Sequence, residues 1–200
     1  MRITLLTLVL ALAGVPGSAH AAVIGEIERK TAGFGYVFGA GVMSVDDPDG
    51  ATGDEFVVQP LALAYTRKLS GDLRYWLEPY YQAATFDASV DEIGQDLTRF
   101  GMRVSFQQYV VPAARFLPWI GAGLDIAHTQ YTSRHTIDVD GYLANRFPDR
   151  SETGVNLLVN AQREWKLSGN RSVNARIEYL SPIGGDMSSL SVSLVYLFDI

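Results

Sequence analysis

The chain has 200 residues, a length that fits one domain, and a formal net charge of −6. An acidic chain of this kind offers no basic patch for nucleic acid, so we expect no nucleic-acid partner. Because cysteine is absent, there is neither a disulfide framework nor an amino-terminal cysteine that could carry a lipid, and packing and hydrogen bonds must hold the fold together.

The amino terminus has the features of a secretory signal peptide. Arg2 precedes an apolar run from Ile3 to Val15, and Ala19-His20-Ala21 has the form of a cleavage site. The run is shorter than the about 20 apolar residues of a membrane-spanning helix. We therefore expect residues 1–21 to be removed on export, with an uncleaved anchor as the alternative. Residues 22–32 are expected to form a short lead-in on the periplasmic side.

From residue 33 onward, apolar residues recur at every second position, as in a β-strand with one apolar and one polar face. Turn residues such as Asp46 to Gly50 and Ser70-Gly71-Asp72 divide the pattern into segments. The expected strands are 33–44, 55–68, 73–87, 95–111, 119–134, 152–167, 172–181 and 189–200. Short connections follow the even-numbered strands. Longer ones, including 45–54, 88–94 and 135–151, follow odd-numbered strands, which is the topology of membrane-spanning barrels.

The last segment has the clearest pattern. Its even positions from Leu190 to Ile200 are all apolar, and its odd positions begin with three serines. Such a final strand, with Phe198 near the carboxyl terminus, resembles that of the small eight-stranded outer-membrane barrels, the family of OmpX and the membrane domain of OmpA. That family usually ends on Phe, whereas this chain ends Phe198-Asp199-Ile200.

This resemblance implies an all-β fold, in which residues 33–200 form a closed antiparallel eight-stranded up-and-down barrel in the outer membrane of a Gram-negative cell. It also implies three kinds of partner. These are the barrel-assembly machinery, which would recognise the last strand, the lipids and lipopolysaccharide of the outer membrane, and a protein partner at the extracellular loops.

Periodicity alone does not say which face of the strands points outward, because a soluble lipocalin-like barrel places its apolar side chains inside. Gly101, Gly121 and Gly123 share a face with Arg99 and Asp125. Inside a narrow lumen, glycine leaves room for long charged side chains, whereas on a solvated surface it would only weaken the strand. We therefore expect the polar face inside and the apolar face toward lipid. The residues expected in the interfacial aromatic belts are Tyr65, Tyr75, Trp165, Tyr196 and, if its side chain turns out of the barrel, Trp119.

Eight charged residues fall on the polar face and are expected to form an interior charge network. Unpaired charges in a narrow lumen are costly, so opposite charges should pair and plug the barrel. The alternative is a conduction path, but continuous water channels belong to barrels of roughly 16 strands. The eight residues are Arg74, Glu78, Arg99, Arg103, Asp125, Glu164, Arg176 and Glu178.

Two prolines, Pro60 and Pro79, lie inside expected strands, where proline removes a ladder hydrogen bond. Counting back from the Ser70-Gly71 turn places them nearly opposite each other. One interpretation is a β-bulge that bends the wall. The other is a lateral seam through which an apolar molecule passes between lumen and bilayer, similar to the opening of palmitoyltransferase and OmpW-like barrels.

Four residues at the outer end of the barrel supply the side-chain types of a hydrolase triad: His128, Ser133, His135 and Glu152. Their spacing matches no local motif of the outer-membrane lipid A deacylases or palmitoyltransferases. The two histidines also have no partner in a recognised metal-ligand spacing. We therefore expect no catalytic residue, metal or cofactor.

Three functional hypotheses follow, in order of preference. The first is a non-enzymatic barrel that acts structurally or through its extracellular loops, by adhesion or by binding a partner or lipopolysaccharide. The second is passage or binding of small hydrophobic molecules through the seam near Pro60 and Pro79. The third is a lipid A-modifying enzyme, either a deacylase or an acyltransferase.

Overall fold

The computed structural model describes residues 32–110, 119–167, 169–184 and 186–200. The expected signal peptide, nearly all of the lead-in and the turn from Pro112 to Pro118 lie outside the described residues. No helix in the described part of the chain has the length and apolar character needed to cross a membrane. The strands are β1 (Ala32–Asp47), β2 (Gly50–Lys68), β3 (Leu73–Phe86), β4 (Gly94–Tyr109), β5 (Trp119–Ile137), β6 (Leu143–Arg146), β7 (Arg150–Leu167), β8 (Arg171–Gly184) and β9 (Met187–Asp199).

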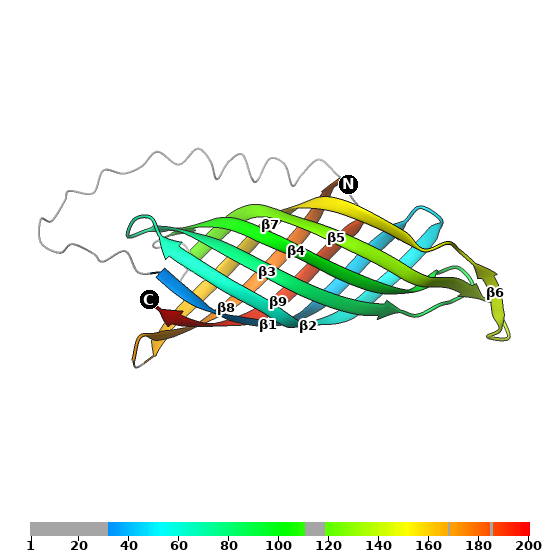
Figure 1. Ribbon diagram of the computed structural model, residues 1–200, viewed down its shortest axis with the longest axis horizontal. Coiled ribbons are helices and arrows are strands. Elements are labelled where there is room, and N and C mark those ends of the chain that lie inside the picture. The colour runs from blue at the N-terminus through cyan, green and yellow to red at the C-terminus, as the bar shows by residue number, and fades with distance from the viewer. Residues whose placement is uncertain (1–31, 111–118, 168, 185) are drawn as a thin grey trace, which may run out of the picture.

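Eight of these strands close into a barrel (Figure 1). Neighbours in sequence pair antiparallel around the ring, β5 pairs with β7, and β9 returns to pair with β1. The remaining strand, β6, pairs only with β5 and forms a hairpin that extends beyond the barrel wall. The expected closed, antiparallel, eight-stranded barrel is confirmed.

The two faces of each strand differ in exposure as the alternation predicts. On β4, Phe106 on the outer face is 54% exposed, whereas Arg103 on the inner face is 5% exposed. Charged and amide side chains inside and large apolar side chains outside are the arrangement of a barrel that spans lipid. The expected orientation of the two faces is therefore confirmed.

The two ends of the barrel differ in structure. At one end the first and last described residues meet, where Ile200 N donates to Ala32 O at 2.7 Å. The tight β2–β3 and β7–β8 turns lie at this same end, and Asn170 in the second turn has a positive φ of 54°. The β6 hairpin marks the opposite end. Short turns belong to the periplasmic side of such barrels, so we call the β6 end the outer end.

Strands at the outer end are longer than the sequence predicts. Residues 45–54 were expected as a loop, but β1 and β2 continue until Asp47 pairs with Gly50. The expected loop 135–151 contains β6 and the turn that joins β5 to β6. In this turn Asp138 Oδ1 accepts hydrogen bonds from two backbone amides. Both faces of a strand are polar once it leaves the membrane, so alternation no longer reveals it.

Aromatic side chains gather at the periplasmic end of the outer surface. Tyr65 and Tyr75 are neighbours there, with ring centroids 6.0 Å apart, and Trp165 is 43% exposed. Trp119 was expected in this belt only if its side chain turned out of the barrel, and the structure places it inside. Its side chain is 5% exposed, and the Arg74 guanidinium lies 3.9 Å from its ring centroid. The cation–π contact with a buried arginine holds the indole inside.

Candidate functional site

The lumen is filled by side chains in layers, and the layer at the periplasmic end is held by Arg74 and Gln107. Arg74 Nη1 lies 2.6 Å from Glu164 Oε2, and its Nε donates to Gln107 Oε1 at 2.8 Å. Trp76 Nε1 donates to the same oxygen at 2.7 Å. The Gln107 amide in turn donates to Asn160 at 2.8 Å. This layer therefore ties β3, β4 and β7 together across the barrel.

The middle layer contains two arginines and two glutamates. Glu78 accepts two hydrogen bonds from Arg176, of which the Nη2–Oε2 bond is 2.8 Å long. Arg103 Nη1 lies 3.0 Å from Glu178 Oε1. Arg176 Nε also reaches Ser193 Oγ at 3.3 Å. All four charged side chains are nearly inaccessible to solvent.

The third layer is centred on Asp125. This carboxylate pairs with Arg99 and accepts hydrogen bonds from Tyr80 Oη at 2.8 Å and from Asn156 Nδ2 at 3.0 Å. Arg99 Nε donates to Tyr80 Oη at 2.7 Å, so the tyrosine bridges the two charged groups. The structure thus brings all eight expected interior charges onto the inner face, and each of the four arginines faces a carboxylate.

Beyond these layers, toward the outer end, the lumen becomes apolar. A cluster of buried residues, which we call the apolar chamber, replaces the charges. Sequence reasoning missed it, because it expected the inward face to be polar along the whole barrel. The only sequence signal is a run of apolar residues in the inward phase at strand ends, as at Met43 and Val45. The chamber consists of Met43, Val45, Val57, Phe86, Leu97, Tyr131, Leu158, Leu180 and Met187.

Ion pairs cover the chamber at the outer mouth. Arg134 on β5 is 2% exposed, and its Nη2 lies 2.7 Å from both Asp47 Oδ1 and Asp49 Oδ2 of the β1–β2 hairpin. Arg150 Nη1 lies 2.8 Å from Asp186 Oδ2 of the β8–β9 connection. We call these five residues the outer lid. They join strand ends from opposite parts of the ring through side-chain contacts.

The wall between β2 and β3 is incompletely paired. Within the described residues the β2–β3 ladder ends at Leu61 and Tyr81, whereas the β3–β4 ladder continues outward as far as Phe86 and Gln95. Along the ladder, the rungs between Ala62–Tyr80 and Tyr65–Leu77 are missing. We call this boundary the β2–β3 seam.

The two prolines lie at this seam but are not opposite each other, as the sequence count had placed them. The β2–β3 register aligns Pro79 with Leu63, at a missing rung, and Pro60 three positions further along. Pro60 instead falls in a bulge of the β1–β2 ladder, where two residues of β2 stand between the pairs Val37–Ala62 and Gly39–Gln59. The β2–β3 register is constant from the turn to Leu61, so the offset of three positions comes from the position of the turn itself, which the count had placed too close to Pro60.

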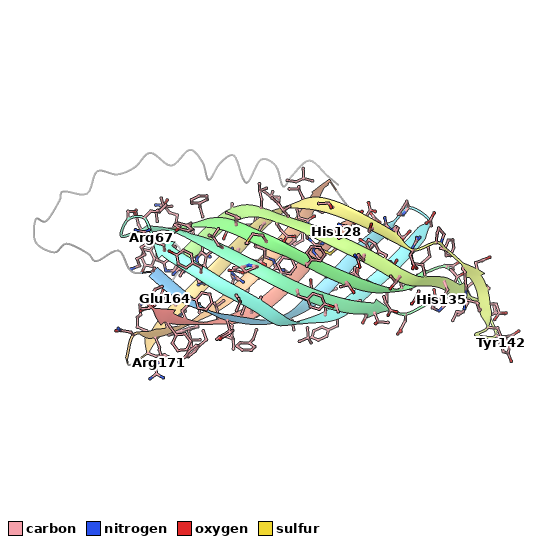
Figure 2. The ribbon with its side chains drawn as sticks, viewed as in Figure 1. Arg67, His128, His135, Tyr142, Glu164 and Arg171 are labelled. Carbon is pink, nitrogen blue, oxygen red and sulfur yellow. The ribbon has the colours of Figure 1, made fainter. Side chains whose placement is uncertain are left out.

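The residue types of a hydrolase triad do not meet in one site. His128 Nδ1 lies 3.0 Å from Thr153 Oγ1, whereas His135 Nδ1 lies 2.7 Å from the Ser133 carbonyl oxygen. Glu152 accepts a hydrogen bond from Tyr131 at 2.8 Å. Figure 2 shows His135 at the outer end and His128 on the barrel wall, well short of that end. The sequence had placed His128 near a strand end, which is wrong because β5 continues to Ile137.

Comparison with known proteins places this geometry among solved structures. No protein-family model and no curated protein matches the sequence. In the structural comparison, the chain is similar to the attachment invasion locus protein Ail of Yersinia pestis, solved with the heparin analogue sucrose octasulfate. The TM-score is 0.50 at 13% identity, over 86% of this chain and 99% of that one. It is also similar to the outer membrane protein AlkL in lipid bilayers, with a TM-score of 0.52 at 12% identity over 92% and 97% of the two chains.

The fold is that of a small outer-membrane β-barrel. Identities of 12% and 13% establish shared architecture rather than shared function. The outer membrane is the location that this fold and its apolar exterior indicate. The expected architecture, an eight-stranded membrane barrel, and the expected location are thus confirmed.

Proposed function

We propose that this barrel binds small hydrophobic molecules in the apolar chamber and passes them sideways into the bilayer through the β2–β3 seam, without catalysis. The observation that carries the proposal is the position of the chamber. A cluster of packed apolar side chains inside the barrel adjoins the least paired part of its wall.

The charged layers close the route toward the periplasm. A molecule without hydrogen-bonding groups would have to separate Arg99 from Asp125 and Arg176 from Glu78 to move along the axis. Breaking a buried ion pair without replacing it costs about 3–5 kcal/mol. The layered network is therefore a floor, and an apolar molecule in the chamber has a lower barrier sideways.

The seam supplies the sideways exit. On its inner side Val57 of β2 and Phe86 of β3 belong to the chamber, and on its outer side Val58 of β2 is 56% exposed toward lipid. Strands that share no ladder hydrogen bonds can separate without breaking any. The continuously unpaired part of the seam begins beyond Tyr81, where the outward residues of β3 are Ala83 and Thr85.

Uptake of an apolar fluorophore by cells tests the proposal. N-phenyl-1-naphthylamine brightens when it enters a bilayer, and Gram-negative cells that produce the barrel should take it up faster than cells that lack it. In the variant V57C/A84C, a reversible bifunctional thiol reagent would bridge the seam, because both positions face the chamber. We expect bridging to abolish the added uptake and reduction to restore it.

The matched control bridges a fully paired part of the wall. Ala83 and Thr98 are partners in the β3–β4 ladder, so cross-linked A83C/T98C should leave uptake unchanged. Because the chain has no cysteine of its own, the thiol reagent reacts only with the introduced cysteines in both variants. Uptake that is equal with and without the barrel, or equal in bridged and reduced V57C/A84C, would count against the proposal.

The β6 hairpin favours a second function, partner binding at the outer end. Val139 is 86% exposed and Tyr142 is 73% exposed at the hairpin tip, beyond the membrane. Neighbouring exposed apolar residues on a projecting loop are typical of protein contacts. Replacing Val139, Tyr142 and Leu143 by serine should reduce adhesion of producing cells to host-cell or bacterial surfaces, with uptake of the fluorophore unchanged.

A further inference from the structure

The outer wall of the barrel carries a groove of about 810 Å³. That volume falls in the range of about 300–1,000 Å³ that ligand pockets occupy. One side is a row of outward residues on five successive strands, and the opposite side is the next outward row. The first row is Tyr36, Leu63, Pro79, Met102 and Ile126, and the second row begins with Phe38, Tyr81 and Phe100. We call it the wall groove.

The strand register explains the shape of the groove. Val37, Ala62, Tyr80, Gly101 and Ala127 lie between the two rows, and the ladders align them from β1 to β5. Their side chains point into the lumen, so they present only backbone to the outside. The groove therefore crosses the strands along the hydrogen-bond direction. Five strands spaced about 4.8 Å apart give it a length of about 19 Å.

The groove rises toward the outer end of the barrel as it passes from β1 to β5. On β1 it lies near the periplasmic end, at Tyr36 and Phe38, whereas on β5 it lies where the outward residues change from Ile126 to His128 and Gln130. Strands tilted by about 40° give a groove of this length a rise of about 12 Å. One leaflet contributes about 15 Å of hydrocarbon. The rise of the groove is thus close to the hydrocarbon thickness of one leaflet.

A polar pair lies at the upper end of the groove. His128 Nδ1 and Thr153 Oγ1 are 3.0 Å apart, and the imidazole packs 5.3 Å from the Phe100 ring, centroid to centroid. Both residues line the groove. Polar groups facing lipid are costly, and they are tolerated best near the interface. One end of the groove can therefore form hydrogen bonds, while the remainder contacts only hydrocarbon.

From this polarity, length and direction, we infer that the wall groove binds one acyl chain of an outer-leaflet lipid. The ester, amide or hydroxyl group at the head of that chain forms hydrogen bonds with His128 and Thr153. The groove is continuous with the lipid-facing surface of the barrel, so a lipid reaches it from the bilayer without crossing the wall. This binding site is separate from the apolar chamber, and it does not depend on passage through the seam.

Photo-cross-linking in nanodiscs tests the inference. The probe is phosphatidylcholine with a diazirine in one acyl chain, and mass spectrometry locates the cross-links. We expect cross-links on β3 and β4 around Tyr81 and Met102 to exceed those around Val192 on the opposite wall by at least fivefold. Cross-links distributed evenly around the barrel would show ordinary surrounding lipid and overturn the inference.

Three outward substitutions sharpen the result. M102W fills the middle of the groove and should reduce its cross-links at least fivefold, whereas V192W, equally bulky but outside the groove, should not change them. T153V keeps the volume and removes the hydroxyl, and we expect about a threefold loss. The heat-dependent gel mobility of barrels shows whether each variant folds. If M102W does not fold, T153V still tests whether the groove binds the lipid. Unchanged cross-linking in T153V would overturn the role of the polar pair.

Discussion

Removal of the Glu78 carboxylate tests the floor of the lumen. In E78M, Arg176 loses both of its short hydrogen bonds to that carboxylate. The nearest remaining acid is Glu178, whose Oε2 lies 3.7 Å from Arg176 Nε and which already pairs with Arg103 at 3.0 Å. Two buried arginines would then share one carboxylate.

The expected cost follows from burial. Both partners of the pair are 2% exposed, so water cannot replace the lost contact. Breaking such a pair costs about 3–5 kcal/mol, whereas replacing both partners by apolar residues is often neutral. We expect E78M to lower the free energy of unfolding by about 3–5 kcal/mol. The double variant E78M/R176M should recover most of that loss.

Guanidinium titration in lipid vesicles, followed by tryptophan fluorescence, measures both values. K166A is the matched control, since Lys166 forms two ion pairs but its side chain is 54% exposed. Exposed pairs contribute at most about 1 kcal/mol. If E78M costs no more than K166A, the lumen must be wet, and the proposed floor would not exist.

Three further results are expected. G101V should destabilise the barrel by at least about 2 kcal/mol in the same titration. Even a Cβ at Gly101 would lie 2.9 Å from Tyr80 Oη and 2.6 Å from the Ile126 carbonyl oxygen. Equal stability of G101V and the unchanged chain would refute this packing. R134Q opens the outer lid and should raise fluorophore uptake several-fold, whereas a slower rate would contradict entry at the outer mouth. Sucrose octasulfate should show no binding by calorimetry, since acids such as Asp49, Asp91 and Asp138 predominate in the described outer connections, and measurable affinity at physiological salt would contradict this.

The sequence predicts what depends on periodicity within one strand. Alternation along residues 95–107 separates Phe100 and Phe106 from Arg99 and Arg103, and the structure places these pairs on opposite faces. The number of barrel strands and the side of each charge follow from the same pattern. Both properties depend only on neighbouring residues in one strand, so the two-residue repeat is enough to predict them.

Properties that depend on contacts across the lumen were not predictable in this way. Arg176 meets Glu78, which is 98 residues away in sequence, and no spacing rule connects the two. Trp119 has the inward phase of Gly121, Gly123 and Asp125, but its cation–π contact with Arg74 comes from another strand and has no local signal. The apolar chamber was missed because an inward valine such as Val45 has the same sequence appearance as an outward one. The bulge at Pro60 in the β1–β2 ladder was not predictable either, because it depends on the pairing with β1 and not on the sequence of β2 alone.

Depth-dependent fluorescence quenching by phospholipids with brominated acyl chains tests most directly which face of the barrel meets lipid. One variant carries F106W as its sole tryptophan, and a second retains only Trp76, which is fully buried in the lumen. We predict strong quenching of the indole introduced at position 106 and almost none of Trp76. The reverse order, or equal quenching of both, would contradict a barrel with charges inside and apolar side chains in the bilayer.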